Sequence, residues 1–112
     1  MSTTRWVTEM GMGVDVRGDD YTKAACRAVF DAIHHSSLNF FEAAGKAHDD
    51  MVIDVHIGVQ QPDRVDVDAV AAELPYGQVT VHVVTGGLDV PTTRGDGNIV
   101  SANAMVLVGF PD

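Results

Sequence analysis

The residues best suited to chemistry lie in a polar segment near the end of the chain. It reads Arg94-Gly95-Asp96-Gly97-Asn98. Arg94 can clamp a carboxylate or imide oxygen, and Asp96 can act as a base or hold a cation. Ser101 and Asn103 follow on the next predicted strand, and we include them with Arg94 and Asn98 among the ligand-binding residues. The same composition also forms an ordinary turn, because Asp and Asn bond their own backbone and Gly supplies positive φ.

A second polar segment follows the first predicted strand. We interpret it as a glycine-rich loop whose backbone amides, together with a helix start, can bind an anion. Its predicted ligand-binding residues are Gly11, Gly13, Asp15, Arg17 and Lys23. The sequence lacks the third glycine of a dinucleotide fingerprint and the Gly-Lys-Ser/Thr of a P-loop. A tight turn with a helix cap is the alternative, since the loop carboxylates would repel a phosphate.

Two carboxylates are the predicted catalytic residues: Asp96, and Glu9 at the end of the first predicted strand, as a general acid or base. His56, His82 and Asp54 lie on the polar sides of two predicted strands and could together bind a transition metal. Their spacing is not a metal signature, and interface histidines are the alternative, so we assign no metal. No pattern in the sequence identifies a cofactor, which stays unknown.

These residues must be positioned by alternating strands and helices. Apolar spacing predicts a strand over 5–12, a helix from Tyr21 that Asp19 or Asp20 can cap, a strand over 51–59, a short helix capped by Asp66, and strands over 78–84 and 100–108, with a loop over 89–98. The order is β-α-β-α-β-β. Right-handed crossovers then give an α+β fold, a four-stranded mixed sheet with two helices on one face.

The other face of this sheet is predicted to be bare and of mixed polarity. Its apolar residues are Trp6, Met10, Met12, Met105 and Leu107, and its polar residues are Thr8, Asp54, His56, Thr80, His82, Ser101 and Asn103. A monomer would expose these methionines and the tryptophan to water. We therefore expect a homo-oligomer, a trimer or a multiple of it, whose sheet faces pack around a shared axis.

Length and charge narrow the class of protein. The 112 residues suit one domain spanning 1–112, and 7 Lys+Arg against 16 Asp+Glu give a formal net charge of −9. Nucleic acids and anionic membranes are disfavoured as partners, because binding to them depends on Lys and Arg. The single cysteine and the absence of an apolar leader behind a basic start favour the cytoplasm.

Several motifs carry a resemblance that spans nearly the whole chain. They are Glu9-Met10-Gly11-Met12-Gly13-Val14-Asp15, Gly18-Asp19-Asp20-Tyr21-Thr22-Lys23-Ala24-Ala25, Leu74-Pro75-Tyr76-Gly77-Gln78, Gly86-Gly87-Leu88, Gly95-Asp96-Gly97-Asn98 and Ala102-Asn103-Ala104. Together they resemble the uncharacterised bacterial family Lin-zero-five-one-two (Lin0512), which brings no established activity. The chain also looks like the trimeric fold group of Bacillus-type chorismate mutase and the YjgF-like deaminases. That likeness implies small-molecule sites in clefts between subunits.

A weaker likeness is to one repeat of the ring-opening amidohydrolases of the cyanuric acid type. Val7 stands where those enzymes have their catalytic lysine, and their Ser-Gly-Gly nucleophile segment is missing, so their chemistry cannot be transferred. The sequence thus predicts an oligomeric small-molecule-binding protein or enzyme with sites in inter-subunit clefts. If it is a hydrolase, we expect its substrate to be a small polar or cyclic amide compound. A non-catalytic assembly or partner-binding module is the alternative.

Overall fold

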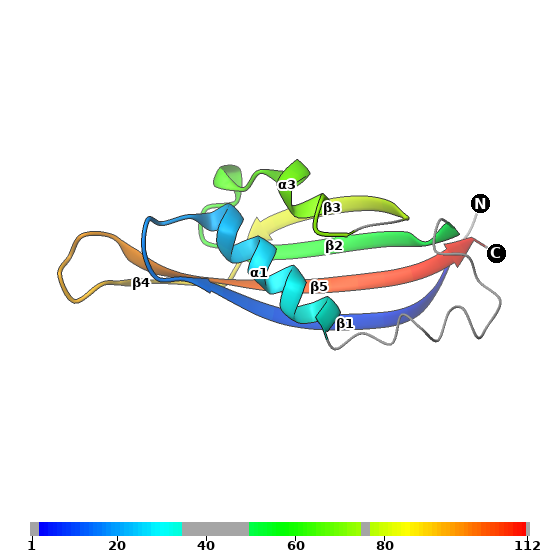
Figure 1. Ribbon diagram of the computed structural model, residues 1–112, viewed down its shortest axis with the longest axis horizontal. Coiled ribbons are helices and arrows are strands. Elements are labelled where there is room, and N and C mark those ends of the chain that lie inside the picture. Colours follow the sequence, from blue (N-terminus) through cyan, green and yellow to red (C-terminus); the bar gives the residue numbers. More distant parts are fainter. Residues whose placement is uncertain (1–2, 35–49, 75–76, 112) are drawn as a thin grey trace.

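The structure, a computed structural model, describes residues 3–34, 50–74 and 77–111, apart from the side chain of Trp6. The elements in order are β1 (Thr3–Asp15), α1 (Tyr21–His34), β2 (Val52–Val59), the 3-10 helix η2 (Pro62–Arg64), α3 (Val67–Ala71), β3 (Gln78–Thr85), β4 (Leu88–Pro91) and β5 (Asn98–Pro111). The predicted mixed α+β class is confirmed. The molecule is elongated, measuring 53 × 25 × 18 Å (Figure 1).

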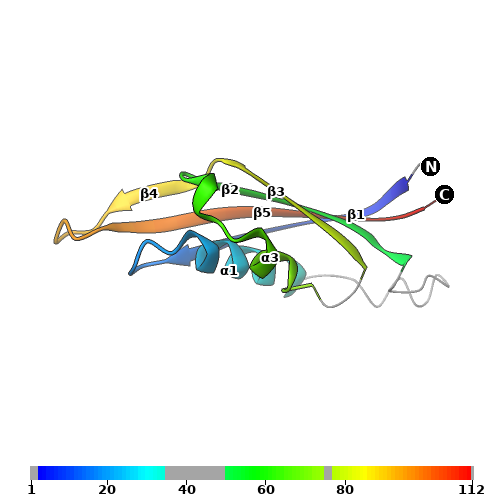
Figure 2. The ribbon, with the colours of Figure 1, turned by 90° about the horizontal axis from the view of Figure 1, so that it is seen from above.

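The strands form one mixed sheet in the order β1-β5-β2-β3, and β4 pairs with β5 beyond the end of β2. Strands β2 and β3 run parallel, whereas β5 is antiparallel to β1, β2 and β4. Figure 2 shows α1 and α3 on the same side of the sheet, the arrangement that right-handed crossovers predict. Among these helices, none is both long and apolar enough to cross a bilayer.

The prediction of four strands is wrong, because the described residues form five. Part of the predicted 89–98 loop is strand β4, which pairs with the start of β5: Val90 lies opposite Ile99, and Pro91 opposite Asn98. Strand β4 pairs with β5 alone, so Pro91, which has no amide hydrogen to donate, is tolerated on this edge strand. The turn of the β4–β5 hairpin therefore shortens to residues 92–97.

The predicted glycine-rich loop is also corrected, since Gly11 and Gly13 belong to β1. A Cβ on Gly11 would lie 2.3 Å from the carbonyl oxygen of Ala28, and one on Gly13 would lie 2.2 Å from that of Ala24. Both contacts are with the backbone of α1. These glycines let the helix lie directly on the strand, and the sequence pattern of glycine opposite alanine reflects this close packing rather than a loop.

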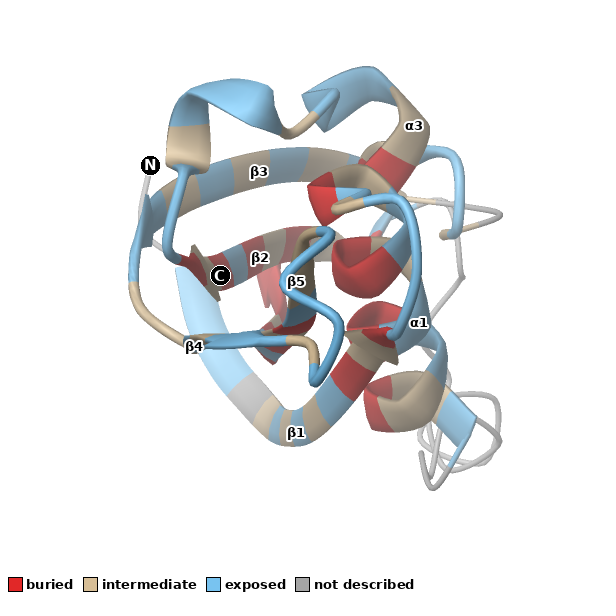
Figure 3. Ribbon diagram, turned by 90° about the vertical axis from the view of Figure 1, so that its left-hand side faces the viewer, coloured by how far each residue is buried: buried red, intermediate tan, exposed pale blue. Residues whose placement is uncertain are grey.

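The core lies between α1 and the sheet, as the helical spacing predicts. The buried residues of α1 are Tyr21, Ala24, Ala25, Ala28, Val29 and Ala32. They face alternate residues of β2 and β5, and Figure 3 shows the buried segments of these elements turned towards one another. Five of these six residues are small, and four of them are alanine. The backbone of α1 can therefore approach the sheet closely, and the core is filled without bulky side chains from the helix.

Aspartates begin both helices, as predicted. The Asp20 carboxylate accepts a hydrogen bond from the Lys23 amide at 2.9 Å. The Asp66 carboxylate accepts from the amides of Asp68 and Ala69 at 3.1 and 3.3 Å. Each cap satisfies backbone donors that the first turn of a helix leaves without partners.

The second face of the sheet is uncovered in the single chain, and its mixed polarity agrees with the prediction. Met10, Met12 and Met105 are 66%, 57% and 50% exposed. The strand register aligns Met10, Met105, His56 and His82 in one row across β1, β5, β2 and β3. The predicted placement of the Trp6 side chain lies outside the described residues.

Candidate functional site

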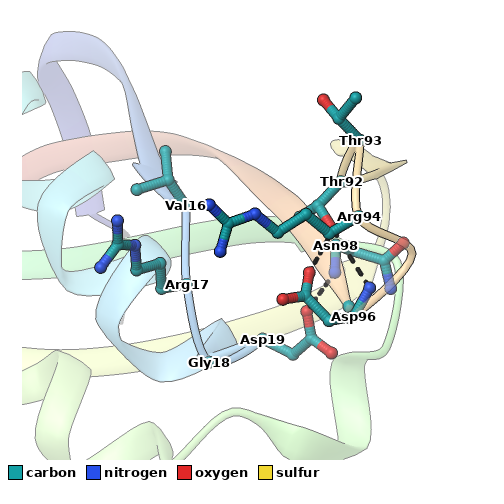
Figure 4. A pocket seen from close by; sticks show the side chains of 10 residues that line it. Val16, Arg17, Gly18, Asp19, Thr92, Thr93, Arg94, Asp96 and Asn98 are labelled. Carbon is teal, nitrogen blue, oxygen red and sulfur yellow. Dashed lines mark hydrogen bonds between the residues drawn. The ribbon is translucent and has the colours of Figure 1, made fainter.

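A hollow of about 480 Å³ opens where the end of β1 meets the tip of the β4–β5 hairpin (Figure 4). We call it the hairpin hollow. It is lined by Val16, Arg17, Gly18, Asp19, Thr92, Thr93, Arg94, Asp96, Gly97 and Asn98. Four of the predicted site residues, two basic and two polar or acidic, thus come together from two ends of the chain: Arg17, Arg94, Asp96 and Asn98.

One hydrogen bond holds the two walls of the hollow together. The Asp19 carboxylate accepts from the Asn98 backbone amide at 2.6 Å. A Cβ on Gly97 would lie 3.2 Å from both oxygens of this carboxylate, a tight contact, and the φ of +132° at Gly97 also favours glycine. Asp19 itself has a left-handed backbone with φ of 49°, a conformation that Asp and Asn tolerate better than most residues.

The hairpin turn is held by its own residues. The Thr92 hydroxyl donates to the Asp96 carboxylate at 2.5 Å, and the Asp96 amide donates back to the hydroxyl oxygen at 3.3 Å. Backbone bonds from the Thr92 amide to the Gly97 carbonyl and from the Gly95 amide to the Thr92 carbonyl, both 3.0 Å, close the turn. Asp96 is therefore fixed in position before any ligand arrives.

Unlike its carboxylates, the two arginines of the hollow have no partner among the residues that the structure describes. Within the part of the chain that the structure describes, neither Arg17 nor Arg94 makes an ion pair or a side-chain hydrogen bond. Figure 4 shows Arg94 reaching from the hairpin across the hollow towards Val16. A guanidinium with five unused donors is suited to bind a planar anionic group such as a carboxylate.

A polar cluster around the buried Tyr21 supports the base of the hairpin. The Tyr21 hydroxyl donates a short hydrogen bond to the Asp89 carboxylate and accepts one from the Gln61 side chain at 3.0 Å. The Arg64 guanidinium lies 4.8 Å from the centre of the Tyr21 ring. Burial, followed by the bond to Asp89, raises the pKa of the Tyr21 hydroxyl. This cluster attaches β4 to the start of α1 directly behind the hollow.

The comparisons with known proteins identify the family. The family model described as conserved hypothetical protein, Lin0512, matches residues 5–108. The chain belongs to the Lin0512 family. A crystal structure of an FtsZ-like protein of unknown function from Nostoc punctiforme is similar to this Lin0512 chain, with 37% identity and a TM-score of 0.89 over 100% of this chain and 99% of that one. No curated protein matches.

Other predicted residues of this Lin0512 protein lie outside the hollow. Asp15 is buried, accepts a hydrogen bond from the Asp20 amide at 3.0 Å, and lies 3.7 Å from Arg27 and 4.0 Å from Lys23. Lys23 is thus directed to Asp15 rather than to the hollow. Glu9 is half-buried on β1, seven residues before Val16, or roughly 23 Å along an extended strand.

Gly11, Gly13, Ser101 and Asn103 likewise do not line the hollow. The two glycines pack against α1. Ser101 and Asn103 alternate with the buried Val100 and the core alanines of β5, so they lie on the uncovered face of the sheet. Of the residues predicted to form one site on the hairpin and the strand after it, those up to Asn98 line the hollow, whereas Ser101 and Asn103 do not.

The sequence reasoning missed Asp19 and Thr92 as site residues. The sequence predicts for Asp19 only the capping of the helix, a function that Asp20 performs. No periodic or spacing signal connects positions 19 and 98, which are 79 residues apart. The pair Thr92 and Asp96 was detectable in principle, because Thr and Asp hydroxyl and carboxylate groups commonly bond across tight turns.

The histidines and the cysteine do not form a metal site in the described residues. His56 and His82 stack with ring centres 4.7 Å apart, and His82 bonds to the Asp54 carboxylate at 3.2 Å. No group of three or more His, Cys, Asp or Glu side chains is arranged there to hold a metal. Burial raises the pKa of Cys26 to about 11, as is typical of a packed thiol rather than of a nucleophile.

Proposed function

We propose that this protein binds a small polar molecule in the hairpin hollow. The observation that carries the proposal is that Arg17 and Arg94 line the hollow without partners among the described residues, while Asp19 and Asp96 are fixed on its walls. The volume of about 480 Å³ lies within the range of small-molecule sites. The hollow is open to solvent at one end of an elongated chain, so a neighbouring subunit can complete it as an inter-subunit cleft.

If the protein is an enzyme, Asp96 is its best-placed acid or base. It is the predicted catalytic carboxylate that lines the hollow, and the Thr92 hydroxyl orients one of its oxygens. Hydrolysis of a cyclic amide would use Arg94 at the carbonyl oxygen and Asp96 to activate water. Glu9 is too far along β1 to share this reaction within one chain.

Thermal unfolding against a library of polar metabolites tests the binding site. A true ligand raises the Tm saturably, because it binds the folded state alone. The double variant Arg94→Ala, Asp96→Ala should lose this stabilisation, while Asp68→Ala, which removes an exposed charged side chain of α3 that does not line the hollow, should keep it. If the double variant is stabilised as fully as the wild type, the hollow is not the binding site.

We also propose that the protein is a homo-oligomer assembled through the uncovered sheet face. Exposed apolar residues gather there: Met10, Met12, Val84, Leu88, Val90, Ile99 and Met105. Its ionisable side chains in the described strands include Arg5, Asp54, His56 and His82, so this face carries little net charge on a chain of −9. Two identical acidic chains meet with least repulsion at such a face, and depletion of charge is typical of interface cores.

Sedimentation analysis of matched variants tests this assembly. Wild-type protein should sediment as an oligomer at micromolar concentration, a trimer or a multiple of it if the chain shares the assembly of the chorismate mutase-like fold. Met105→Glu should dissociate it, because the charge would be buried at the contact. Phe30→Glu, which changes an exposed apolar residue of α1 instead, should not. A monomeric wild-type protein would contradict the proposal.

The β1-β5-β2-β3 order with two helices on one side supports assignment to the chorismate mutase-like fold group. The cytoplasm is the compartment we propose, on the strength of the single cysteine. A non-catalytic assembly module is the second candidate function, and the uncovered apolar face favours it. That function would be indicated by an intact oligomer that no metabolite stabilises.

A further inference from the structure

We infer that the hairpin hollow takes a zwitterion, a small molecule with a carboxylate at one end and an ammonium group at the other. This inference rests on the proposed function and names the class of ligand. It follows from the presence of two guanidiniums and two carboxylates in the lining of one hollow, Arg17 and Arg94 with Asp19 and Asp96.

The cationic side of the hollow is available to a ligand. Arg94 crosses the hollow from the hairpin, whereas Arg17 lines it from the segment after β1, with its guanidinium turned away from the hairpin (Figure 4). In the described part of the chain, no carboxylate lies within 4.0 Å of either guanidinium, so their charges are not neutralised by Asp19 or Asp96. A ligand carboxylate can therefore form the bidentate contact that an arginine favours.

The anionic side is held ready by bonds within the protein. Asp19 uses Oδ1 to accept the Asn98 amide, and Asp96 uses Oδ1 to accept the Thr92 hydroxyl. These bonds orient each carboxylate and leave its Oδ2 without a hydrogen bond from the described residues. An ammonium group, which has three donors and no acceptor, matches two oxygens that have acceptor capacity to spare.

Charge balance separates a zwitterion from simpler ions. Two guanidiniums and two carboxylates give the hollow a formal charge of 2 − 2 = 0 on a chain of −9. A plain anion would meet two carboxylates and the repulsion of the whole molecule, and a plain cation would meet two guanidiniums. A ligand with both charges satisfies both sides of the hollow at once, and neither half alone does so.

Nuclear magnetic resonance titration of the full chain with three matched probes tests the inference. The probes are 4-aminobutyrate, butyrate and butylamine, which share a four-carbon chain and differ in their charges; glycine and 6-aminohexanoate vary the charge separation. At low ionic strength, where exposed charges are least screened, the best amino acid of the series should bind at least about tenfold more tightly than butyrate or butylamine. The shifted amides should be those of residues 16–19 and 92–98.

Two variants identify the side of the hollow that each charge contacts. Arg94→Ala should lower the affinity for the amino acid about tenfold or more, towards that of butylamine. Asp96→Asn keeps an oxygen for the Thr92 hydroxyl and removes the negative charge. It should therefore weaken binding of the amino acid and strengthen binding of butyrate. Asp68→Asn, the same change at an exposed position of α3 that does not line the hollow, should change none of these affinities. Opposite effects of one variant on two probes would not arise from a general loss of folding.

The inference is overturned if butyrate binds as tightly as every amino acid, or if the amino acids shift amides elsewhere. A metabolite that stabilises the protein through Arg94 and Asp96 but carries a single charge would support the proposed function and contradict the inference that the ligand is a zwitterion. If none of the five probes shifts the amides of the hollow, the zwitterion inference fails, and the metabolite library alone decides whether the proposed function stands.

Discussion

The carboxylate of Asp19 accepts a hydrogen bond from the backbone amide of Asn98 at 2.6 Å, across 79 residues of sequence. This bond joins the segment after β1 to the end of the β4–β5 hairpin, and the hairpin hollow lies between the two. The Arg64 guanidinium also bonds to the Asp19 carbonyl at 3.2 Å. Asp19 therefore sets the separation of the two walls that carry Arg17 and Arg94.

Replacing Asp19 with alanine should both destabilise the protein and open the hollow. A hydrogen bond to a charged group contributes about 1.5–3 kcal/mol, and alanine is also poorly suited to the left-handed backbone at this position. We expect Asp19→Ala to lower the free energy of unfolding in urea by about 2 kcal/mol. Asp19→Asn, which keeps an oxygen acceptor and tolerates positive φ, should lose less than half as much. Equal losses in the two variants would show that the bond to Asn98 contributes little.

The contact between β1 and α1 gives a second prediction. A Cβ at Gly13 would lie 2.2 Å from the carbonyl oxygen of Ala24 and 2.3 Å from the amide nitrogen of Ala28, so Gly13→Ala requires the helix to move away from the strand. We expect a loss of about 3 kcal/mol or more in urea unfolding. Gly95→Ala is the matched control. A Cβ at Gly95 would meet no atom within 4 Å, but the φ of +71° is unfavourable for alanine, so this variant should lose about 1 kcal/mol of unfolding free energy. Similar losses in both variants would contradict the close packing.

The sequence was sufficient for the elements whose signal is local. The alanine spacing from Tyr21 to Ala32 predicts α1 and its buried face, and alternation along β2 and β5 predicts which side of the sheet each residue occupies. Strand β4 was missed, because Pro91 and the glycines that follow it are typical of loops and only pairing with β5 makes this segment extended. Gly11 and Gly13 were assigned to a loop for a related reason. In sequence, a glycine that lets a helix pack closely on a strand cannot be distinguished from a glycine that forms a turn.

The site was predictable only on its hairpin side. Arg94, Asp96 and Asn98 were found because charged groups in a glycine-rich turn are visible in the sequence, and Arg17 because it follows a glycine-containing segment. Asp19 was not found, since its function depends on a partner 79 residues away. Contacts of that kind are set by the crossing of β1 and the hairpin, which no local pattern encodes.

A pH-dependent change in stability should report on the Tyr21 hydroxyl. Its pKa is raised above 10.0 by burial and then by the bond to Asp89, so the folded protein favours the protonated form. The stabilising contribution is therefore complete below pH 10 and is lost as pH rises through the higher pKa of the folded state. Tyr21→Phe cannot titrate here, and it leaves the Asp89 carboxylate without its donor.

We expect Tyr21→Phe to be about 1–3 kcal/mol less stable than wild type at pH 8, because the part-buried Asp89 carboxylate loses its donor. The difference between the two proteins should then narrow as the pH rises above 10, measured by urea unfolding at successive pH values. Cys26 titrates in both proteins, so its contribution cancels in the difference. A gap of constant size from pH 8 to pH 11 would mean that Tyr21 does not couple to the fold through its proton.

Alkylation of Cys26 should be slow in the folded protein. Burial, followed by the negative charge of Glu73, raises the pKa of the thiol from 9.0 to about 11. Each pKa step of one is a tenfold change in ionisation, so at pH 8 the thiolate population is about 100-fold lower than for an ordinary thiol. Since the thiolate is the reactive form, iodoacetamide should modify the native protein about 100-fold more slowly than the chain unfolded in urea, as followed by mass spectrometry. Glu73→Gln, which removes one of the charges that oppose ionisation, should speed the native reaction several-fold. Native Cys26 that reacts as fast as the unfolded chain would instead mark it as an accessible, ionised nucleophile and reopen the question of which residue does chemistry in this protein.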